Sequence, residues 1–201
     1  MIGLLAAVSG RSAEDAVRSA AALGEVNGFV VGAELIMGPG PAIVSALAGL
    51  GPVMVLAGLH GDIPSAAAAA TRLADYGATW VTVQAKDGPD LVAAVAAAGV
   101  RVVAVTLRPG QGDGEVAALR LGQSRGRTVS RLAELAAGAG AVGVLCDSPD
   151  LGVVAQVAPA ADRFVRVATV EDATRAVDRG ATHLIAGSDL LPTVRDALAA
   201  R

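Results

Sequence analysis

The feature that most constrains the fold is a regular alternation between short β-branched runs and alanine-rich stretches. The runs are almost continuously apolar, which is typical of parallel strands covered on both faces. The alanine-rich stretches between them favour helices. We expect strands at residues 2–8, 28–32, 53–59, 79–85, 101–107, 141–146, 163–168 and 183–187.

Start and stop signals support the helices between these strands. Residues 12–15 and 169–172 each resemble a capping box, in which a Ser or Thr hydroxyl accepts from the backbone three residues later. Ser148 before Pro149 predicts an N-cap followed by a proline at the first helical position. Glycines at positions 24, 77, 140 and 180 mark expected helix ends, each shortly before the next strand.

Eight strand–helix units in 201 residues predict a single (βα)8 barrel domain over residues 1–201. A doubly wound open sheet is the rival, because it shares the same alternation. The count of eight favours the barrel, and no G-x-G-x-x-G motif follows the first strand. Residues 109–128 interrupt the pattern with many glycines and arginines, so we interpret them as a βα loop with a broken helix. They form a candidate lid, although an ordinary solvated loop fits as well.

Composition narrows the function classes. A net charge of −3 and only four aromatic residues argue against a nucleic-acid partner. No uninterrupted apolar run is long enough to cross a membrane, and residues 1–8 are interpreted as a strand rather than a signal peptide. The lone Cys146 excludes an intramolecular disulfide and fits a reducing cytoplasm. We therefore expect a cytoplasmic protein with a small-molecule ligand.

Four segments carry a family resemblance. Residues 28–35 resemble the second-strand segment GFKVGLEL of orotidine 5'-monophosphate decarboxylases, and residues 55–65 resemble their third-strand motif FLDLKLHDIPNT. Residues 78–85 resemble ADMVTVHA, and residues 180–188 resemble GADYLVVGR. The chain is thus identified as a member of this superfamily, which also holds sugar-phosphate decarboxylases and hexulose-phosphate synthases. The resemblance implies a (βα)8 barrel, a homodimer and lyase chemistry in biosynthesis, and we expect no cofactor.

The charged array that the resemblance implies is largely missing. Decarboxylation in the family uses alternating Lys and Asp residues, which destabilise the substrate carboxylate and stabilise and protonate the developing carbanion. Val30 stands at the first lysine, and Ala57 and Leu59 stand at the third-strand Asp and Lys. Asp62 alone survives, and Ala7 replaces the first-strand Asp that contacts the ribose. Ordinary orotidine monophosphate decarboxylation is therefore not expected.

The implied phosphate site is weakened too. In the superfamily, glycine-containing turns after the seventh and eighth strands bind phosphate beside an arginine. Here the seventh strand leads to Thr169 without a glycine, and the eighth ends at Gly187 with Ser188 in the arginine position. Asp189 would repel a phosphate dianion unless it points away. Backbone groups near Thr169 and Gly187 could still bind an anion.

Other polar residues at strand ends form a replacement set. Lys86 is the only lysine in the chain, and a lysine can act as a base or nucleophile where an arginine cannot. His60 can act as an acid or base, with Asp62 to orient it or, as the resemblance implies, to reach the site of a neighbouring subunit. A solvated loop lysine and a helix N-cap are the structural alternatives for Lys86 and Asp62.

The remaining polar residues are assigned to ligand binding or to structure. The candidate ligand-binding residues are Ser9, Glu34, Arg108, Thr169, Gly187 and Ser188. His183 and Cys146 are interpreted as structural. No metal site is expected, although Glu34, His60 and Asp62 offer a weak alternative for a hard cation. The sequence favours a repurposed lyase acting on a small anionic or nucleoside-like metabolite with Lys86, His60 and Asp62, or a non-catalytic relative that binds a small molecule or a partner.

Overall fold

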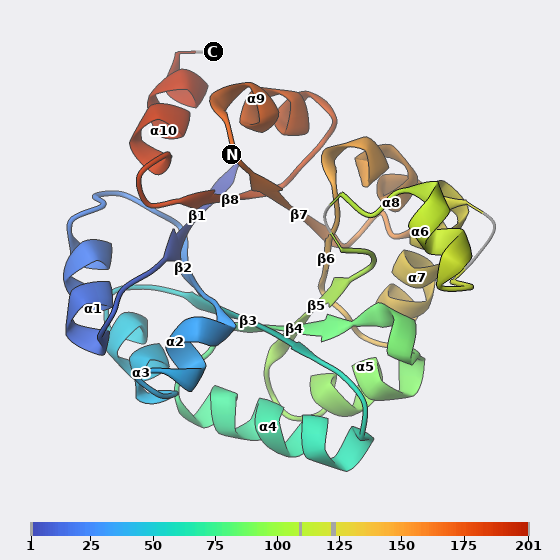
Figure 1. Ribbon diagram of the computed structural model, residues 1–201, viewed down its shortest axis with the longest axis horizontal. Helices are drawn as coiled ribbons and strands as arrows, with labels where there is room; N and C mark the ends of the chain where they lie inside the picture. The colour runs from blue at the N-terminus through green and yellow to red at the C-terminus, as the bar shows by residue number, and fades with distance from the viewer. Residues whose placement is uncertain (1, 109, 122–123, 201) are drawn as a thin grey trace.

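The computed structural model describes residues 2–108, 110–121 and 124–200. Its parallel strands close into a barrel in chain order, from β1 to β8, and β8 pairs back onto β1 (Figure 1). The strands are β1 (Gly3–Val8), β2 (Gly28–Val31), β3 (Val53–Leu59), β4 (Trp80–Gln84), β5 (Arg101–Val105), β6 (Gly143–Leu145), β7 (Asp162–Val167) and β8 (His183–Gly187). The predicted (βα)8 barrel is therefore confirmed, and no strand end differs from its expected position by more than two residues.

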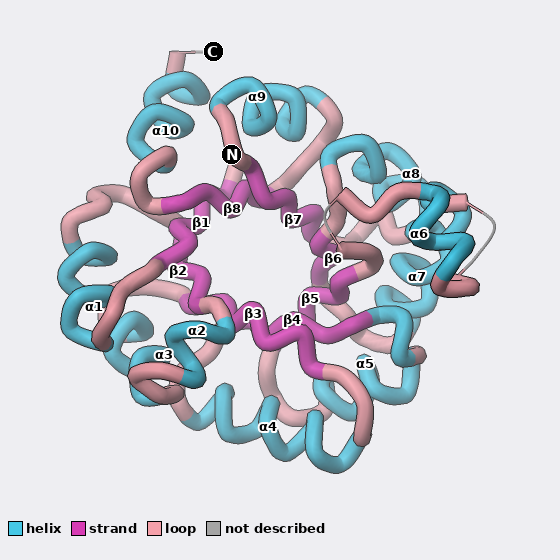
Figure 2. The backbone as a smooth tube through the Cα atoms, viewed as in Figure 1, coloured by secondary structure: helices cyan, strands magenta, loops and turns pink. Residues whose placement is uncertain are grey.

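Helices surround the barrel on its outside (Figure 2). They are α1 (Ala13–Ala21), α2 (Ala33–Met37), α3 (Ala42–Ala48), α4 (Ile63–Asp75), α5 (Pro89–Ala96), α6 (Asp113–Ala118), α7 (Arg125–Gly138), α8 (Leu151–Val157), α9 (Val170–Asp178) and α10 (Leu191–Ala199). Short 3₁₀ turns, Ala85–Asp87 and Ser148–Asp150, follow β4 and β6. No helix among the described residues is both long enough and apolar enough to span a bilayer.

The structure confirms most of the predicted helix start and stop signals, but not the one at Ser148. Ser12 and Thr169 cap α1 and α9 as expected, since their hydroxyls accept from the backbone N–H three residues later at 3.1 and 3.0 Å. The four predicted terminal glycines all adopt positive φ angles, between 72° and 97°. Ser148 was wrong as an N-cap: it lies inside the 3₁₀ turn after β6, with its hydroxyl buried and unpaired among the described residues.

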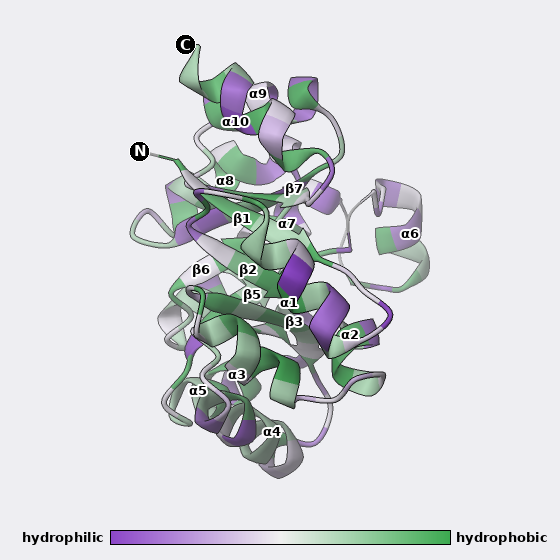
Figure 3. Cartoon of the chain, turned by 90° about the vertical axis from the view of Figure 1, so that its left-hand side faces the viewer, coloured by the Kyte–Doolittle hydropathy of each residue, from purple (hydrophilic) through white to green (hydrophobic). Residues whose placement is uncertain are grey.

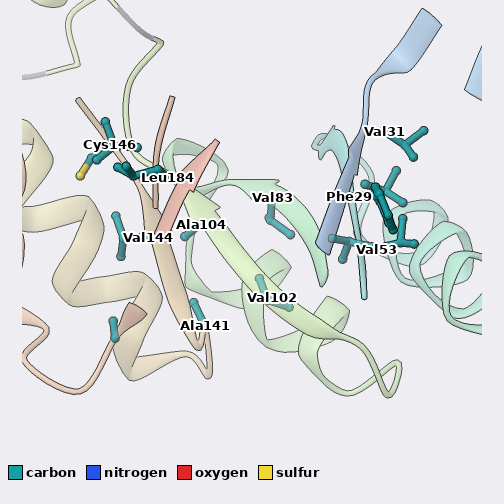
Figure 4. Packing of buried hydrophobic residues seen from close by; sticks show 14 of the residues in the cluster. Phe29, Val31, Val53, Val83, Val102, Ala104, Ala141, Val144, Cys146 and Leu184 are labelled. Carbon is teal, nitrogen blue, oxygen red and sulfur yellow. The ribbon is translucent and has the colours of Figure 1, made fainter. Parts of the chain in front are cut away.

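Two apolar layers hold the barrel together. Strand residues that point outward pack against the helices, as Phe29, Val31 and Val53 do in Figure 4. Residues at alternating positions point inward and fill the barrel, because successive strand side chains face opposite sides. The inner layer consists of Leu5, Val30, Met54, Trp80, Val103, Val105, Leu145, Phe164 and Ile185. The barrel is thus filled through its middle, and any open space lies at its ends.

The two ends of the barrel differ in character. Figure 3 shows the N-terminus at one end and helices α2 and α6 at the other, which is the end where the parallel strands finish. The N-terminal end is closed by stacked rings, with the Phe164 and His183 centroids 4.4 Å apart. At this end charged side chains pair with one another, as Arg101 and Asp162 do at 3.6 Å, whereas the carboxyl ends of the strands surround an open cavity.

Candidate functional site

A cavity of about 770 Å³ opens at the carboxyl ends of the strands. Its wall runs from β3 to β7 and includes Leu56, Gln84, Val105, Leu145 and Arg166, one from each strand in turn. Functional sites of (βα)8 barrels lie at this end, because the βα loops converge there on a rigid frame. This cavity is the candidate ligand site.

Three of the nine predicted site residues line the cavity: His60, Lys86 and Arg108. Lys86 lies in the 3₁₀ turn after β4, His60 follows β3 and Arg108 follows β5. All three are exposed to solvent. Arg108 already has a partner, since its Nη2 donates to both carboxylate oxygens of Glu115 at 2.6 Å.

Sequence reasoning missed Arg166, which lines this wall together with the cations Lys86 and Arg108. It lies on β7 two residues after the inward-facing Phe164, so the strand alternation directs it into the mouth of the barrel. No hydrogen bond or ion pair engages the side chain of Arg166 or Lys86 within the described part of the chain. The available signal was a charged residue between two apolar strand neighbours, Val165 and Val167.

Neutral polar groups were missed as well. Thr82, Gln84, Thr106 and Gln111 line the cavity. The Thr82 hydroxyl is committed to the β3 backbone, accepting from Gly58 N–H at 2.8 Å and donating to a carbonyl at 3.4 Å. The contact lies at an irregularity of β3, where Gly58 has a φ of +54°. Thr82, Gln84 and Lys86 are two positions apart along the predicted strand, so strand alternation would have predicted that they share one face.

Several predicted residues lie away from the cavity wall. Asp62 caps α4: its carboxylate accepts from Ser65 N–H at 2.9 Å, and this hydrogen bonding lowers the Asp62 pKa. Glu34 lies in α2 with its carboxylate against the backbone of Gly32. Ser9 is exposed after β1 and does not line the cavity.

His60 and Asp62 therefore do not meet as an acid–base pair among the described residues, although only two positions separate them. The described residues also contain no group of three or more His, Cys, Asp or Glu side chains that could hold a metal ion. The weak alternative of a cation on Glu34, His60 and Asp62 was thus wrong. The geometric reason is that each carboxylate is turned toward the backbone of its own helix start.

The expected phosphate-binding end is occupied by the protein itself. The Thr169 hydroxyl accepts from Asp172 N–H. A β-carbon on Gly187 would lie 2.7 Å from Asp189 Oδ1, so this carboxylate lies against the end of β8 instead of pointing away. Thr169, Gly187 and Ser188 do not line the cavity. A dianion at this position would face the Asp189 carboxylate.

Arg125 connects the irregular segment after β5 to residues that follow β6. Arg125 Nη2 donates to Asp147 Oδ2 at 2.8 Å, Nε donates to Asp150 Oδ1 at 3.2 Å, and Nη1 donates to the Gln111 carbonyl. Burial disfavours the charged guanidinium, but Asp150 and Asp147 outweigh it and raise the Arg125 pKa above its ordinary value.

Helix α6 follows Gln111 and contributes Glu115 and Leu119 to the cavity wall. Figure 1 shows α6 at the rim of the barrel and not across its centre. Pro109 and residues 122–123 of the expected lid lie outside the described residues. A closing movement of this segment stays a prediction.

Two titratable groups have structural surroundings, as their positions in the sequence indicated. Burial raises the pKa of the Cys146 thiol to about 12, and Asp150 and Asp147 add to the effect, so the reactive thiolate is strongly disfavoured. His183 lies at the amino end of β8, stacked on Phe164, and burial lowers its pKa. Neither group lines the cavity.

Comparison with known proteins identifies the family. No protein-family model matches the chain. An orotidine 5'-phosphate decarboxylase of Anaeromyxobacter sp. (strain K) is 38% identical over 197 residues, covering 88% of this chain and 85% of that protein. The chain belongs to the orotidine 5'-phosphate decarboxylase family. Another orotidine 5'-phosphate decarboxylase, from Alkalilimnicola ehrlichii, is 34% identical over 178 residues and covers 78% and 75% of the two chains.

Solved structures agree in fold. The orotidine 5'-phosphate decarboxylase of Lactobacillus acidophilus has a TM-score of 0.86 at 18% identity and covers 98% of this chain and 99% of its own. An uncharacterized conserved protein of Geobacillus kaustophilus has a TM-score of 0.84 at 23% identity, with 98% and 97% covered. At these identities the likeness establishes the barrel architecture alone.

The residues that stand at the family's two lysines and third-strand aspartate are apolar in this chain and lie in different surroundings. Val30 is buried in the inner layer, so an apolar side chain occupies the position of the first lysine. Ala57 lines the cavity with a methyl group in place of a carboxylate. Leu59 packs against the outer apolar layer, away from the cavity. Lys86 follows β4, so it does not restore an ammonium group at either missing position.

Proposed function

We propose that this member of the orotidine 5'-phosphate decarboxylase family binds a small anionic metabolite in the mouth of its barrel and does not decarboxylate orotidine 5'-phosphate. One observation carries the proposal: Lys86 and Arg166 face the same cavity without a carboxylate partner from the described residues. Cations in a cleft with low-dielectric walls concentrate the positive potential and attract anions. Glu115, the one carboxylate that the described residues contribute to the wall, is paired with Arg108.

The loss of decarboxylation follows from the residues that replace the array. The reaction needs fixed charges beside the departing carboxylate and the developing carbanion, and such preorganised charges are usually the largest catalytic contribution. Val30 and Ala57 supply none. Because about 1.4 kcal/mol of lost stabilisation lowers a rate tenfold, removing several charges abolishes useful turnover.

Ligand-dependent thermal unfolding tests the binding proposal. The ligands are inorganic phosphate, small carboxylates, pentose phosphates, uridine monophosphate and orotidine monophosphate. A ligand at a hundred times its Kd adds about 2.7 kcal/mol of stability, which is readily seen as a raised Tm. We expect Arg166→Gln to weaken the binding at least about tenfold, while Arg131→Gln, an exposed cation on α7 outside the cavity, leaves it unchanged.

The same preparation tests the loss of chemistry. Protein from a host that lacks its own orotidine monophosphate decarboxylase should release no carbon dioxide from this substrate. The proposal is wrong if the protein turns over orotidine monophosphate, or if no anion raises the Tm and Arg166→Gln changes nothing.

A lyase acting on a different anion is the second candidate. It is favoured by the Lys86 ammonium group, which lines the cavity together with His60. A lysine can exchange its proton during a reaction, whereas an arginine stays charged. Lys86→Arg should therefore preserve binding of the anion but abolish turnover, while His60→Asn should lower turnover. Equal activity of Lys86→Arg and the parent protein would eliminate this candidate.

We further propose a homodimer in which Asp62 acts toward the neighbouring subunit. Two observations support it: Asp62 does not line the cavity of its own chain, and the adjacent Ile63 is 38% exposed at the start of α4. Sedimentation velocity should report a dimer, and Ile63→Glu should shift it toward monomer. A monomeric parent protein at high concentration would refute the proposal.

A further inference from the structure

The cavity offers many polar side chains, but few of them are free to meet a ligand. The hydroxyl of Thr82 is engaged with the β3 backbone. The buried Gln111 uses its Oε1 to accept from Arg108 N–H at 3.1 Å, and Arg108 binds Glu115. The Thr106 hydroxyl has no hydrogen-bond partner among the described residues, but it is buried away from solvent. The hydrogen-bonding groups that a ligand can use therefore come from the other side chains of the wall.

Within the described part of the chain, the solvent-accessible side chains of the wall without a hydrogen bond or ion pair are those of His60, Gln84, Lys86 and Arg166. Lysine and arginine only donate hydrogen bonds. Among these groups only the Gln84 carbonyl and a neutral His60 nitrogen can accept. The free wall is therefore rich in donors and poor in acceptors, with no free carboxylate.

This imbalance discriminates between classes of anion. Each buried hydroxyl of a ribose or sugar has a proton to donate, and a buried donor left without an acceptor weakens binding. A carboxylate brings only acceptor oxygens, and its geometry matches the planar fork of an arginine. The site is thus better matched to a carboxylate without hydroxyl groups than to a nucleotide or sugar phosphate.

The two free cations lie on different sides of the mouth. Lys86 follows β4 and Arg166 is on β7, and β5 and β6 stand between them in the barrel (Figure 2). These two intervening strands present apolar side chains to the cavity, Val105 and Leu145. The two unpaired cations are therefore separated by the apolar side chains of β5 and β6, and the paired Arg108 and Glu115 lie on the segment that follows β5.

We infer that the cavity binds a small dicarboxylate with an apolar body, one carboxylate on Arg166 and the other on Lys86. The inference rests on the proposed anion-binding function and specifies its ligand class. The carboxylate on Arg166 is held by the guanidinium fork, and the body lies over Val105 and Leu145. The Lys86 ammonium binds the distal carboxylate, so ligand length is limited by the distance across these strands.

The test is isothermal titration with unbranched dicarboxylates from malonate to adipate, each beside its monomethyl ester. Ribose 5-phosphate and uridine monophosphate complete the series. We expect one chain length to bind best, at least about tenfold tighter than its monoester and than both phosphorylated compounds. In Lys86→Gln the dicarboxylate should bind no better than its monoester, and in Arg166→Gln both should weaken.

The outcomes separate this inference from the proposed function. If uridine monophosphate or ribose 5-phosphate binds tighter than every dicarboxylate, the ligand class is wrong but the anion site stands. If dicarboxylate and monoester bind equally in the parent protein, the second carboxylate has no partner and the inference fails. If no anion binds at all, both fail. Arg131→Gln serves as the control for loss of one positive charge.

Discussion

Arg125→Gln should lower the free energy of unfolding more than charge removal at Lys86, Arg108 or Arg166. Arg125 is 18% exposed and joins two carboxylates, Asp147 at 27% and Asp150 at 5% exposure. The Asp147 carboxylate also accepts from Gly110 N–H at 3.0 Å, so the same cluster fixes the start of the segment after β5. Glutamine keeps much of the side-chain length but removes the charge and the fork.

The magnitude follows from the burial of the partners. Breaking a buried ion pair by removing one member typically costs about 3–5 kcal/mol, because the other charge stays buried without compensation. Partial exposure of Arg125 and Asp147 reduces this, and we expect about 2–4 kcal/mol. For a chain of this size a loss of 3 kcal/mol lowers the Tm by about 6–12 °C.

Urea denaturation of Arg125→Gln beside Arg108→Gln measures the effect with a matched control. The Arg108–Glu115 pair is 65% and 40% exposed, so its loss should cost less than about 1 kcal/mol. Hydrogen exchange should show faster exchange of the Gly110 amide in Arg125→Gln only. Equal and small losses in the two variants would refute the reasoning that burial of Asp150 makes this pair important.

Three further predictions concern single groups. Burial lowers the pKa of His183 in the folded state below the unfolded value near 6.5. The free energy of unfolding therefore keeps the full His183 contribution above pH 6.5 and loses it as the pH falls toward the folded pKa. His183→Gln should flatten this part of the stability–pH curve, and an unchanged slope would contradict the prediction. The Cys146 thiol, with a pKa of about 12, should react with a disulfide reagent at pH 8 only after unfolding, and rapid labelling of the native protein would disprove this. Glu115→Gln should release Arg108 into the cavity and tighten anion binding by about tenfold or less in titration calorimetry, whereas weaker binding would show that Glu115 itself contacts the ligand.

The ligand-site residues could be predicted only in part. Lys86, His60 and Arg108 were found because each follows directly on a strand, and the carboxyl ends of parallel strands share one end of a barrel. Asp62 was also placed after a strand, yet its carboxylate caps α4. Position along the chain therefore located strand ends reliably but did not determine where a short side chain turns.

Arg166 shows the opposite error. It lies within β7, so a search limited to strand ends passed over it, although it faces the cavity. Its direction depends on Phe164 pointing inward, and that is decided by the closure of the barrel rather than by β7 alone. Charged residues inside apolar strands of a predicted barrel are therefore candidates for the mouth.

The sequence by itself determined the barrel and the loss of the family's charges. Apolar periodicity, capping hydroxyls and terminal glycines act within a few residues, so the expected strands and most helix ends followed from local chemistry. No folding can place an ammonium group where Val30 and Leu59 stand.

Tertiary structure alone decided which polar groups are free. It joined Arg125 to Asp150 and turned Asp189 over Gly187, and it left Lys86 and Arg166 without a side-chain partner from the described residues. Such pairings depend on distances between strands far apart in the sequence, and these distances are set only when the barrel closes.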